Sequence, residues 1–534
     1  MIKNNFKENL EEAKKFHQSG DLISAINLYL RILKNENNSP ELFFYLGTAY
    51  LQSGSYNNSI KYLEKSLESE KFNPMIYNNL GIAFKEIREF EKAEKYFNSA
   101  LKIKKDFIQV YNNQGIVSRK LKNFDKSLKF LKKAIELDHN YFEAYNNIGN
   151  TLNDIGDKEK AITNYKKAIE LKPDYLDAYL NLGIGYQELK HYENAKKSFL
   201  KVIELNPDFS FIRGKLLHLN MHLCDWRDFT KDVKSIENSI DNKIITDPFL
   251  FLSASNDQSA QKKMAENYVE KFYNLKQLNI LKNKKNDIPK IGYFSPDFSN
   301  HPVLHLMVDT FKNHNKKDFE FYAFSFGLKA RSESHFKAKT YFKDFIYIDE
   351  ISDKNVAKLC RDIGIDIAID LCGHTAENRL GVFAERVAKN QVNYLGYPGT
   401  SGAKFIDYII ADKHIIPENE QKNYTEKVLY LPNCYQSNPT EDIISKKEFK
   451  KSDFNLPEDK FIYCNFNNHN KITPIMFKSW LRILKKVKNS VLWLYVTNDI
   501  AKNNILTEAR KSSINSNRII FADSLEHSEH LKRI

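Results

Sequence analysis

The stretch Asn147-Ile-Gly149-Asn-Thr-Leu-Asn-Asp-Ile-Gly-Asp-Lys-Glu-Lys-Ala161-Ile-Thr-Asn-Tyr165 is one copy of a pattern that repeats along the N-terminal part of the chain. Its glycine recurs every 34 residues, at Gly47, Gly81, Gly115, Gly149 and Gly183. Twelve places after each glycine position stands a small residue, one of Ala25, Ser59, Ala93, Ser127, Ala161 and Ala195. Four places later stands a large one, Tyr29, Leu63, Phe97, Leu131, Tyr165 or Phe199. A fixed period of this length is typical of stacked helical repeats.

The period of 34 residues is that of the tetratricopeptide (TPR) repeat, a pair of antiparallel helices. One pair cannot bury its own apolar face, so small residues let neighbouring helices approach while large ones fill the space between units. Extending the glycine position back to Ala13 gives six units, from about Phe6 to about Phe209. Such an array is a curved solenoid with a concave surface, and it predicts a module that recognises a partner protein or peptide.

The composition describes a globular chain of several domains. With 534 residues and 42% hydrophobic content, the chain is too long for a single core, and two to four domains are expected. Five scattered cysteines without metal-ligand spacing fit reduced, buried thiols in a cytoplasmic protein. The first residues contain no signal-peptide core, and no run of about 18 apolar residues occurs, so we expect neither secretion nor a membrane span.

The net charge of +13 has two interpretations. One is an anionic partner such as nucleic acid, a membrane surface or a nucleotide diphosphate. The other is a lysine-rich composition on solvated helix faces. The lysines are dispersed among glutamates, as in Lys166-Lys-Ala-Ile-Glu170, rather than gathered beside aromatic residues. This dispersal favours the second interpretation and argues against nucleic acid or a membrane as a partner.

The pattern changes after Pro207, where the 34-residue period stops. From Lys290, short apolar runs alternate with helical segments, which predicts mostly parallel sheets with helices on both faces. We expect helices near 353–363 and 376–388, and strands at 291–295, 319–326, 365–371, 392–395, 408–411 and 428–431. A second series has helices at 474–487 and about 501–512, and strands at 461–466, 491–496 and 518–522.

These changes predict a repeat array (6–209), a helical junction (210–286), a first α/β lobe (287–436), a connecting segment (437–455) and a partial second lobe (456–534). The fold class is therefore an α-solenoid followed by a two-lobed, Rossmann-like α/β domain. Ligands of such sheets bind at the carboxyl ends of the strands, so a cleft between the lobes is the expected site. Three strands alone would expose a sheet edge in the second lobe, and we interpret the sequence as truncated there.

Polar and glycine-rich motifs follow four of the expected strands. They are Ser295-Pro-Asp-Phe-Ser-Asn-His-Pro302, Asp370-Leu-Cys-Gly-His-Thr375, Leu395-Gly-Tyr-Pro-Gly-Thr-Ser-Gly402 and Tyr463-Cys-Asn-Phe-Asn-Asn-His-Asn-Lys471. Active-site groups of α/β folds converge at such strand ends. Together with the repeats, Asp407-Tyr-Ile-Ile-Ala-Asp412 and Cys224-Asp-Trp226, the ordered motifs resemble the O-linked N-acetylglucosamine (O-GlcNAc) transferase family over essentially the whole chain.

That family joins TPR arrays to a two-lobed GT-B glycosyltransferase of glycosyltransferase family 41. The resemblance implies inverting transfer of N-acetylglucosamine from UDP-GlcNAc to Ser or Thr hydroxyls of proteins, with no metal ion or other cofactor required. A neutral hydroxyl needs a base with a pKa near about 6.5, such as histidine. His301 matches the family's proposed base, and Pro302 after it favours an extended conformation. His374 is the second candidate; alternatively, both are hydrogen-bonded loop histidines that shape the donor pocket.

The departing diphosphate accumulates negative charge, which a positioned cation stabilises in the transition state. Lys471 matches the family lysine with this role, the alternative being a solvated surface lysine, and Asn468 takes a donor-contact position. The resemblance implies further donor contacts from Pro398, Thr400, Leu525, His527, His530 and Arg533. His527 departs from a frequent lysine, and Thr400 alternatively belongs to a tight turn beside the pocket. The family's next strand and phosphate-gripping loop are missing after this segment, so we expect the chain as given to bind UDP-sugar poorly.

Asparagine recurs with the same period two residues before each glycine, at Asn79, Asn113, Asn147 and Asn181. An amide both donates and accepts hydrogen bonds, so a ladder of asparagines on the concave side can hold a peptide backbone with little sequence preference. This resembles the asparagine ladder of the family. The alternative is a merely polar, exposed face in an Asn-rich chain, and the low helix propensity of Asn favours the ladder.

The sequence leaves three functions open. The first is a cytoplasmic protein O-GlcNAc transferase, which the retained His301, His374 and Lys471 favour. The second is a relative that uses another sugar donor or modifies Asn. The third is a non-catalytic TPR adaptor with an incomplete transferase domain. The motifs do not decide the acceptor proteins, the natural C-terminus or the oligomeric state, and the repeats also allow self-association.

Overall fold

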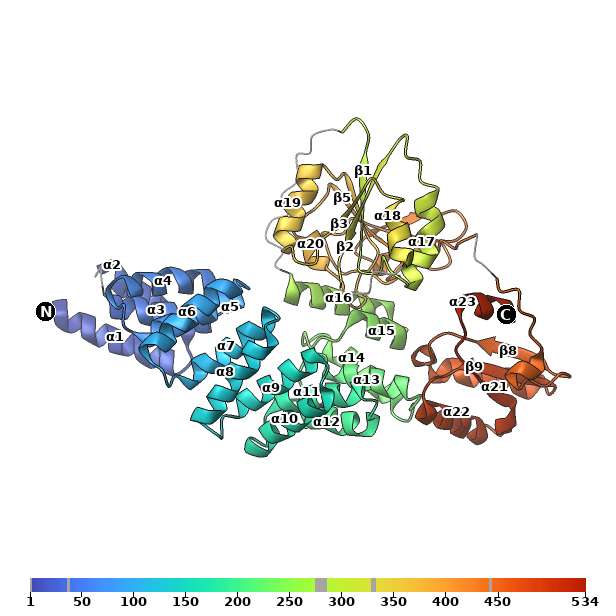
Figure 1. Ribbon diagram of the computed structural model, residues 1–534, viewed down its shortest axis with the longest axis horizontal. Helices are drawn as coiled ribbons and strands as arrows, with labels where there is room; N and C mark the ends of the chain where they lie inside the picture. Colours follow the sequence, from blue (N-terminus) through green and yellow to red (C-terminus); the bar gives the residue numbers. More distant parts are fainter. Residues whose placement is uncertain (1, 36–38, 274–285, 328–332, 441–443) are drawn as a thin grey trace. The chain divides into compact units, whose positions relative to one another are not determined.

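The computed structural model describes residues 2–35, 39–273, 286–327, 333–440 and 444–534. The chain divides into two compact units, Met1–Pro207 and Asp208–Ile534. The described residues of the first unit are helical, and those of the second add two parallel sheets to further helices (Figure 1). The predicted fold class, a TPR α-solenoid followed by a two-lobed α/β domain, is confirmed.

The described helices of the first unit form six successive pairs, one for each predicted repeat. Their bounds are α1 (Ile2–Gln18), α2 (Leu22–Asn35), α3 (Pro40–Gln52), α4 (Tyr56–Ser69), α5 (Pro74–Glu86), α6 (Phe90–Ile103), α7 (Ile108–Lys120), α8 (Phe124–Leu137), α9 (Phe142–Ile155), α10 (Lys158–Leu171), α11 (Leu176–Glu188) and α12 (Tyr192–Leu205). The two helices of a pair pack on each other, and the second packs on the first helix of the next pair. Each unit therefore completes the core of its neighbour.

The repeat glycines are required by the large side chain that follows them. A Cβ atom on Gly81 would lie 2.5 Å from a ring carbon of Phe97, and one on Gly149 would lie 2.4 Å from a ring carbon of Tyr165. Both rings are buried between the helices. Glycine is therefore the residue that lets the two helices of a repeat approach this closely.

The turn inside each repeat also has a 34-residue period, although only three of the six turn positions hold glycine. Residues with a left-handed backbone recur at Gly20, Gly54, Arg88, Lys122, Gly156 and Lys190. At Arg88, whose φ is 64°, the next residue's N–H donates to the Phe84 carbonyl at 2.9 Å, which closes the end of α5. The hydrogen bond fixes this conformation even where a residue other than glycine stands.

We predict that Gly81→Ala lowers the free energy of unfolding of the solenoid by about 1–3 kcal/mol, because the added methyl group overpacks against Phe97. Chemical denaturation followed by circular dichroism measures this change. Gly185→Ala is the matched control, since its Cβ would lie 3.3 Å from a side-chain carbon of Ile162. A larger loss in the control than in Gly81→Ala would contradict this account of the repeat.

Four junction helices open the second unit: α13 (Ile212–His222), α14 (Phe229–Ser239), α15 (Pro248–Ala254) and α16 (Gln258–Phe272). They share one core, which includes Leu217, Phe229, Ile236, Phe251 and Met264. The Asp247 carboxylate caps α15 by accepting the Phe249 N–H at 2.9 Å. The end of the predicted junction (210–286) falls on residues 274–285, which lie outside the described residues, and on Asn286.

The first sheet of the second unit has the order β3-β2-β1-β4-β5-β6-β7, and every pairing is parallel. Its strands are β1 (Lys290–Ser295), β2 (Glu320–Ser325), β3 (Asp344–Tyr347), β4 (Ile367–Asp370), β5 (Asn390–Tyr394), β6 (Tyr408–Ala411) and β7 (Lys427–Tyr430). The connections contain α17 (Pro302–Lys312), α18 (Glu333–Lys339), α19 (Asp353–Ile363), α20 (Leu380–Ala384) and the 3-10 helix η1 (Glu418–Asn423).

Two features of this lobe differ from the sequence expectations. The strand β3 and the helices α17 and α18 were not among the expected elements. The helix expected at 376–388 is wrong in length, since α20 spans only Leu380–Ala384. Glu377 and Arg386, on either side of α20, have left-handed backbones with φ of 61° and 56°, and this conformation ends a helix.

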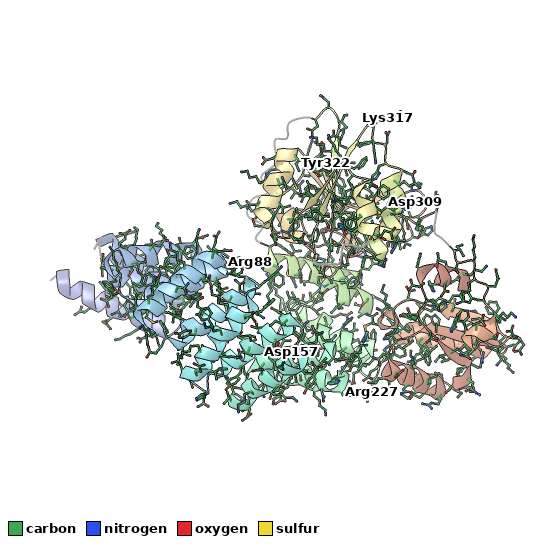
Figure 2. The ribbon with its side chains drawn as sticks, in the orientation of Figure 1. Arg88, Asp157, Arg227, Asp309, Lys317 and Tyr322 are labelled. Carbon is green, nitrogen blue, oxygen red and sulfur yellow. The ribbon has the colours of Figure 1, made fainter. Side chains whose placement is uncertain are left out.

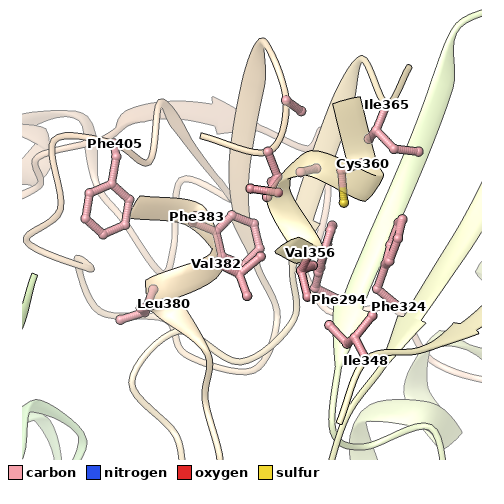
Figure 3. Packing of buried hydrophobic residues seen from close by; sticks show 14 of the residues in the cluster. Phe294, Phe324, Ile348, Val356, Cys360, Ile365, Leu380, Val382, Phe383 and Phe405 are labelled. Carbon is pink, nitrogen blue, oxygen red and sulfur yellow. The ribbon is translucent and has the colours of Figure 1, made fainter. Parts of the chain in front are cut away.

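Side chains of β1 alternate between two cores, one on each face of the sheet. Phe294 stacks on Phe324 at 4.4 Å and packs with Val356 and Cys360 (Figure 3). Its neighbour Tyr293 points to the opposite face. There the core contains Phe298, Leu304, Met307 and Phe311, which come from the loop after β1 and from α17.

The second sheet has the order β10-β9-β8 and is also parallel. Its strands are β8 (Phe461–Asn465), β9 (Ser490–Tyr495) and β10 (Ile519–Ala522), and its helices are α21 (Pro474–Lys486), α22 (Asp499–Lys511) and α23 (His527–Arg533), with η2 (Lys451–Phe454), η3 (His469–Lys471) and η4 (Ser516–Arg518). The lobe buries Cys224 with Phe477 and Leu494, and Trp226 packs on Phe477 at 5.2 Å.

The Cys224-Asp-Trp226 motif of the junction thus belongs to the core of the second lobe. All five cysteines are free thiols, and Cys224, Cys360 and Cys372 are buried. The expectation that every thiol is buried is wrong for Cys434 and Cys464, which are exposed.

Candidate active site

His301 immediately precedes α17 and caps this helix. Its backbone is extended (φ −142°, ψ 147°), as expected before proline, and the Val303 N–H donates to Nδ1 at 3.3 Å. Oδ1 of the buried Asp297 lies 3.4 Å from the same nitrogen. A neutral ring satisfies only one of these contacts. When Nδ1 carries its proton toward Asp297, Nε2 becomes the basic nitrogen, which is the chemistry of a carboxylate-oriented general base.

A cavity of about 570 Å³ lies at the carboxyl ends of β1, β2 and β3, beside this histidine. Ser299, His335 and Tyr347 are among its lining residues. The Ser299 carbonyl accepts the His301 N–H at 2.7 Å, so the cavity borders the turn that carries the candidate base. His335 donates from Nδ1 to the Phe298 carbonyl at 2.5 Å and accepts the Tyr347 hydroxyl at Nε2 at 2.9 Å. Sequence reasoning assigned no role to His335 or Tyr347.

His374 is held inside the fold, with 3% of its surface exposed. Its Nε2 donates to the Ser401 carbonyl at 2.7 Å, and its ring lies edge-on to those of Tyr268 and Tyr397. Burial lowers the pKa of His374 to about 4. The structure therefore favours the alternative for this residue, a hydrogen-bonded loop histidine that shapes the pocket, over a base that reaches an acceptor hydroxyl.

The glycine-rich loop 395–402 is organised by Glu426, which sequence reasoning missed. This buried carboxylate accepts the Thr400 hydroxyl at 2.7 Å, the Ser401 N–H at 2.6 Å and the Ser401 hydroxyl. Ser401 is also the residue whose carbonyl holds His374. The Thr400 hydroxyl is thus engaged by protein groups, as in the tight-turn alternative, while Pro398 is half-buried and its carbonyl accepts the Tyr424 hydroxyl at 3.1 Å.

Asp370 has a similar supporting role under the neighbouring loop. Its carboxylate accepts the Cys372 N–H at 2.9 Å and the Gly373 N–H at 3.1 Å. Burial raises the pKa of Asp370 to about 6, although these two hydrogen bonds favour the charged form. Asp370 stood in a quoted motif, but only the structure identifies it as the group that shapes the turn before His374.

The predicted donor residues of the second lobe gather around the loop after β8. Asn468 and Lys471 are exposed at the start and end of the η3 turn, where the Lys471 N–H donates to the Asn468 carbonyl at 3.0 Å. Phe466 in the same loop carries the Arg533 guanidinium over its ring at 4.5 Å and the His530 ring edge-on at 5.2 Å. Arg533 Nε donates to His530 Nδ1 at 3.0 Å. The loop therefore packs directly on α23, with the half-buried Leu525 just before this helix.

The two strand-end sites meet through α17 and α23. The His305 N–H donates to the His301 carbonyl at 3.1 Å, and the His305 ring stacks on that of the exposed His527 at 5.8 Å. Asp309, labelled in Figure 2, accepts the Thr440 N–H at 2.7 Å and so joins α17 to the segment between the lobes. The structure brings the start of α17 toward the predicted donor segment, whereas His374 and Thr400 are buried around the glycine-rich loop.

The asparagine ladder of the solenoid is part of a chain of amides between repeats. The Nδ2 groups of Asn113, Asn147 and Asn181 donate to Oδ1 of the asparagine that precedes the ladder position in the previous repeat, Asn78, Asn112 and Asn146, at 3.3, 2.8 and 3.0 Å. Asn79 donates to the Thr48 hydroxyl at 3.1 Å and is buried. The amide nitrogens thus link the repeats to one another. The atom that these side chains can offer to a peptide N–H is the acceptor Oδ1.

No group of three or more His, Cys, Asp or Glu residues in the part of the chain that the structure describes is arranged to hold a metal ion. Nor does that part of the chain contain a helix with the length and apolar character needed to cross a membrane.

We predict that Glu426→Ala lowers the free energy of unfolding of the second unit by about 3 kcal/mol, because it removes the acceptor of buried donors in residues 400 and 401. Denaturant titration followed by tryptophan fluorescence measures the loss. Glu418→Ala, which removes one exposed ion pair with Lys413, is the control and should leave the stability unchanged. Equal stabilities of the two variants would contradict the role of Glu426.

The contribution of His374 to the stability of the second unit should fall as the pH drops from about 6.5 toward 4. In this range the unfolded chain binds a proton at residue 374, whose ordinary pKa is 6.5, while the buried ring stays neutral down to about 4. His374→Gln removes this component, so its stability relative to wild type should improve by up to about 3 kcal/mol on acidification. Parallel stability profiles for the two proteins between pH 7.5 and pH 4 would refute the burial of a neutral His374.

Comparison with known proteins agrees with the fold and the motifs. The sequence model of glycosyl transferase family 41 matches residues 223–447 and 436–534, and TPR models match segments between residues 46 and 209. A mutant of the O-GlcNAc transferase of Thermobaculum terrenum has a similar fold, with a TM-score of 0.54 and 19% identity over 79% of this chain and 75% of that one.

Two curated plant relatives resemble parts of the chain. The probable UDP-N-acetylglucosamine–peptide N-acetylglucosaminyltransferase SEC of Arabidopsis thaliana is 35% identical over 249 residues, 46% of this chain and 26% of the relative. The corresponding SPINDLY protein of Solanum lycopersicum is 34% identical over 208 residues, 38% of this chain and 22% of the relative. The matches thus span about a quarter of these relatives. The family model matches residues 223 to 534, which is more than half of the chain, and the chain therefore belongs to glycosyl transferase family 41.

Proposed function

We propose that the protein is a glycosyltransferase that transfers N-acetylglucosamine from UDP-GlcNAc to Ser or Thr hydroxyls of proteins. The observation that carries this proposal is the meeting of two strand-end sites within one unit. One is the Lys471 turn packed on α23, and the other is the His301–Asp297 pair, whose helix contacts His527 through His305. The family membership and the names of the plant relatives support the proposal.

In the proposed reaction, the acceptor hydroxyl oxygen attacks C1 of the sugar from the face opposite the nucleotide, so the configuration at C1 inverts. The new bond joins this oxygen to C1, while the bond from C1 to the β-phosphate oxygen breaks and its electron pair leaves with UDP. The hydroxyl proton passes to Nε2 of His301, as Nδ1 donates to Asp297. Lys471 stabilises the charge that develops on the diphosphate, and the proposal uses no metal ion or other cofactor.

The acceptor protein would bind along the repeats. Oδ1 of Asn113, Asn147 and Asn181 would accept N–H groups of an extended peptide, because none of the described hydrogen bonds uses these oxygens. A backbone contact of this kind selects an extended conformation rather than a sequence, so the proposed acceptors are many proteins with exposed, flexible Ser or Thr segments. A cytoplasmic location, and self-association through the repeats, rest on the sequence alone.

The test is intact-mass spectrometry of an acceptor protein incubated with UDP-GlcNAc and the protein expressed from the complete open reading frame that contains residues 1–534. We expect the mass of one or more N-acetylglucosamine units to appear on the acceptor. Lys471→Ala and His301→Ala should each slow the transfer by about 100-fold or more, because they remove charge stabilisation and the base. Lys478→Ala, on the exposed side of α21, is the matched lysine control and should transfer at the wild-type rate.

Any result other than the expected one points to a specific alternative function or site. Transfer from a different nucleotide sugar, or to Asn, would replace the donor or acceptor in the proposal. No transfer by the complete protein, with peptide still bound by the repeats, would overturn it in favour of a TPR adaptor. Equal rates for Lys471→Ala and Lys478→Ala would remove Lys471 from the reaction.

A further inference from the structure

The η3 turn, which carries Lys471, is hydrogen-bonded to the C-terminal end of α13. We infer that His469, through its bonds to this helix end, is a positioning residue for Lys471, an inference that rests on the proposed function. His469 stood in a quoted motif but received no role in the sequence analysis. The inference is carried by three contacts between η3 and the junction.

The first contact fixes the side chain of His469. Its Nε2 lies 3.0 Å from the His222 carbonyl, and the ring is buried with 1% of its surface exposed. A carbonyl oxygen only accepts, so Nε2 carries the proton and donates. The His222 ring packs beside it, with the ring centres 4.9 Å apart. This buried hydrogen bond ties the first residue of η3 to the last residue of α13.

The second contact fixes the backbone of the same residue. The buried Cys224 thiol donates to the His469 carbonyl at an S–O distance of 3.8 Å, and this carbonyl also accepts the Ile472 N–H at 3.1 Å. The adjacent Leu223 carbonyl accepts Nδ2 of Asn504 from α22 at 2.9 Å. The residues just after α13 are therefore bonded to η3 and to α22, and the His469 carbonyl that Cys224 contacts is also the acceptor that closes the turn.

The third contact lies one residue closer to the lysine. Nδ2 of Asn470 donates to Nε2 of His218 at 3.3 Å, one helical turn before His222 on α13. Burial lowers the pKa of both His218 and His469 to about 4, so both rings are neutral near pH 7 and present the donor and the acceptor that these contacts need. His469 and Asn470, the two residues that precede Lys471, are both bonded to α13.

The lysine itself differs from the two residues before it. Lys471 is exposed, and its N–H donates to Asn468 at 3.0 Å. A lysine side chain is a flexible four-carbon stem, so the location of its ammonium group depends on where the backbone turn is held. A misplacement of about 1 Å is enough to reduce electrostatic stabilisation strongly. The bonds from α13 supply that placement from outside the ligand site.

The test compares UDP with uridine, because a residue that acts through Lys471 should affect only the ligand that carries a diphosphate. In the complete protein, His469→Leu keeps an apolar side chain in the core but removes the donor to His222. We expect it to weaken UDP binding about tenfold in calorimetric titration and to leave uridine binding unchanged. His469→Gln, which restores an N–H donor, should recover most of the UDP affinity. Asn470→Ala, at a half-buried position, is a milder variant with the same expected pattern.

A double-mutant cycle separates positioning from general damage. His469→Leu should cause no further loss of UDP affinity in a Lys471→Ala background, since the group that it positions is already absent. Additive losses, equal losses of UDP and uridine affinity, or wild-type UDP affinity in both His469→Leu and Asn470→Ala would overturn the inference. Absence of UDP binding by the wild-type protein would instead overturn the proposed function.

Discussion

Both lobes of the second unit are built onto the same junction helices, and the candidate site depends on that shared packing. Val269 of α16 is buried in the core of the first lobe with Phe294 and Phe383, while Cys224 after α13 is buried in the core of the second lobe with Phe477. The helices also share a core of their own. Because a close-packed core yields little to deformation, this platform fixes the loops at the strand ends of each sheet. The glycine-rich loop shows the effect, since a Cβ on Gly402 would lie 2.4 Å from the backbone of α16.

Burial divides the strand-end residues into supports and groups that can reach a ligand. His374, Thr400, Glu426 and Asp370 are buried, and their polar groups make hydrogen bonds within these loops. They therefore hold the loops in shape. His301, Asn468, Lys471 and His527 belong to other segments, namely the loops after β1 and β8 and the start of α23. They are exposed or half-buried there, where a donor and an acceptor could meet. The same division holds in the solenoid, where buried glycines and aromatic rings set the spacing and partly exposed asparagine amides line the repeats. Function is thus expected from a few exposed or half-buried polar groups, such as His301 beside the buried Asp297.

Much of the fold could be predicted because its sequence is periodic. The spacing of the repeat glycines gave all six helix pairs, and the alternation of apolar runs gave every strand except the short, half-buried β3. The left-handed turn residues were hidden because Arg88, Lys122 and Lys190 stand where glycine is usual. In the candidate site, motifs identified the loops but not the supports. Glu426 lies far along the chain from Thr400, and the burial of His374 depends on Tyr268 of α16, a contact that no local pattern displays. The role of the Cys224 segment likewise required the packing of the second lobe.

The proposed function requires a nucleotide diphosphate to bind at the loop after β8 and to face the start of α17. A crystal structure of the complete protein with UDP-GlcNAc and an acceptor peptide tests it most directly. We expect diphosphate oxygens within hydrogen-bonding distance of Lys471 Nζ, the nucleoside against α23, and the acceptor hydroxyl nearest to His301. A nucleotide bound away from the loop after β8, or an acceptor hydroxyl that approaches another base, would contradict it.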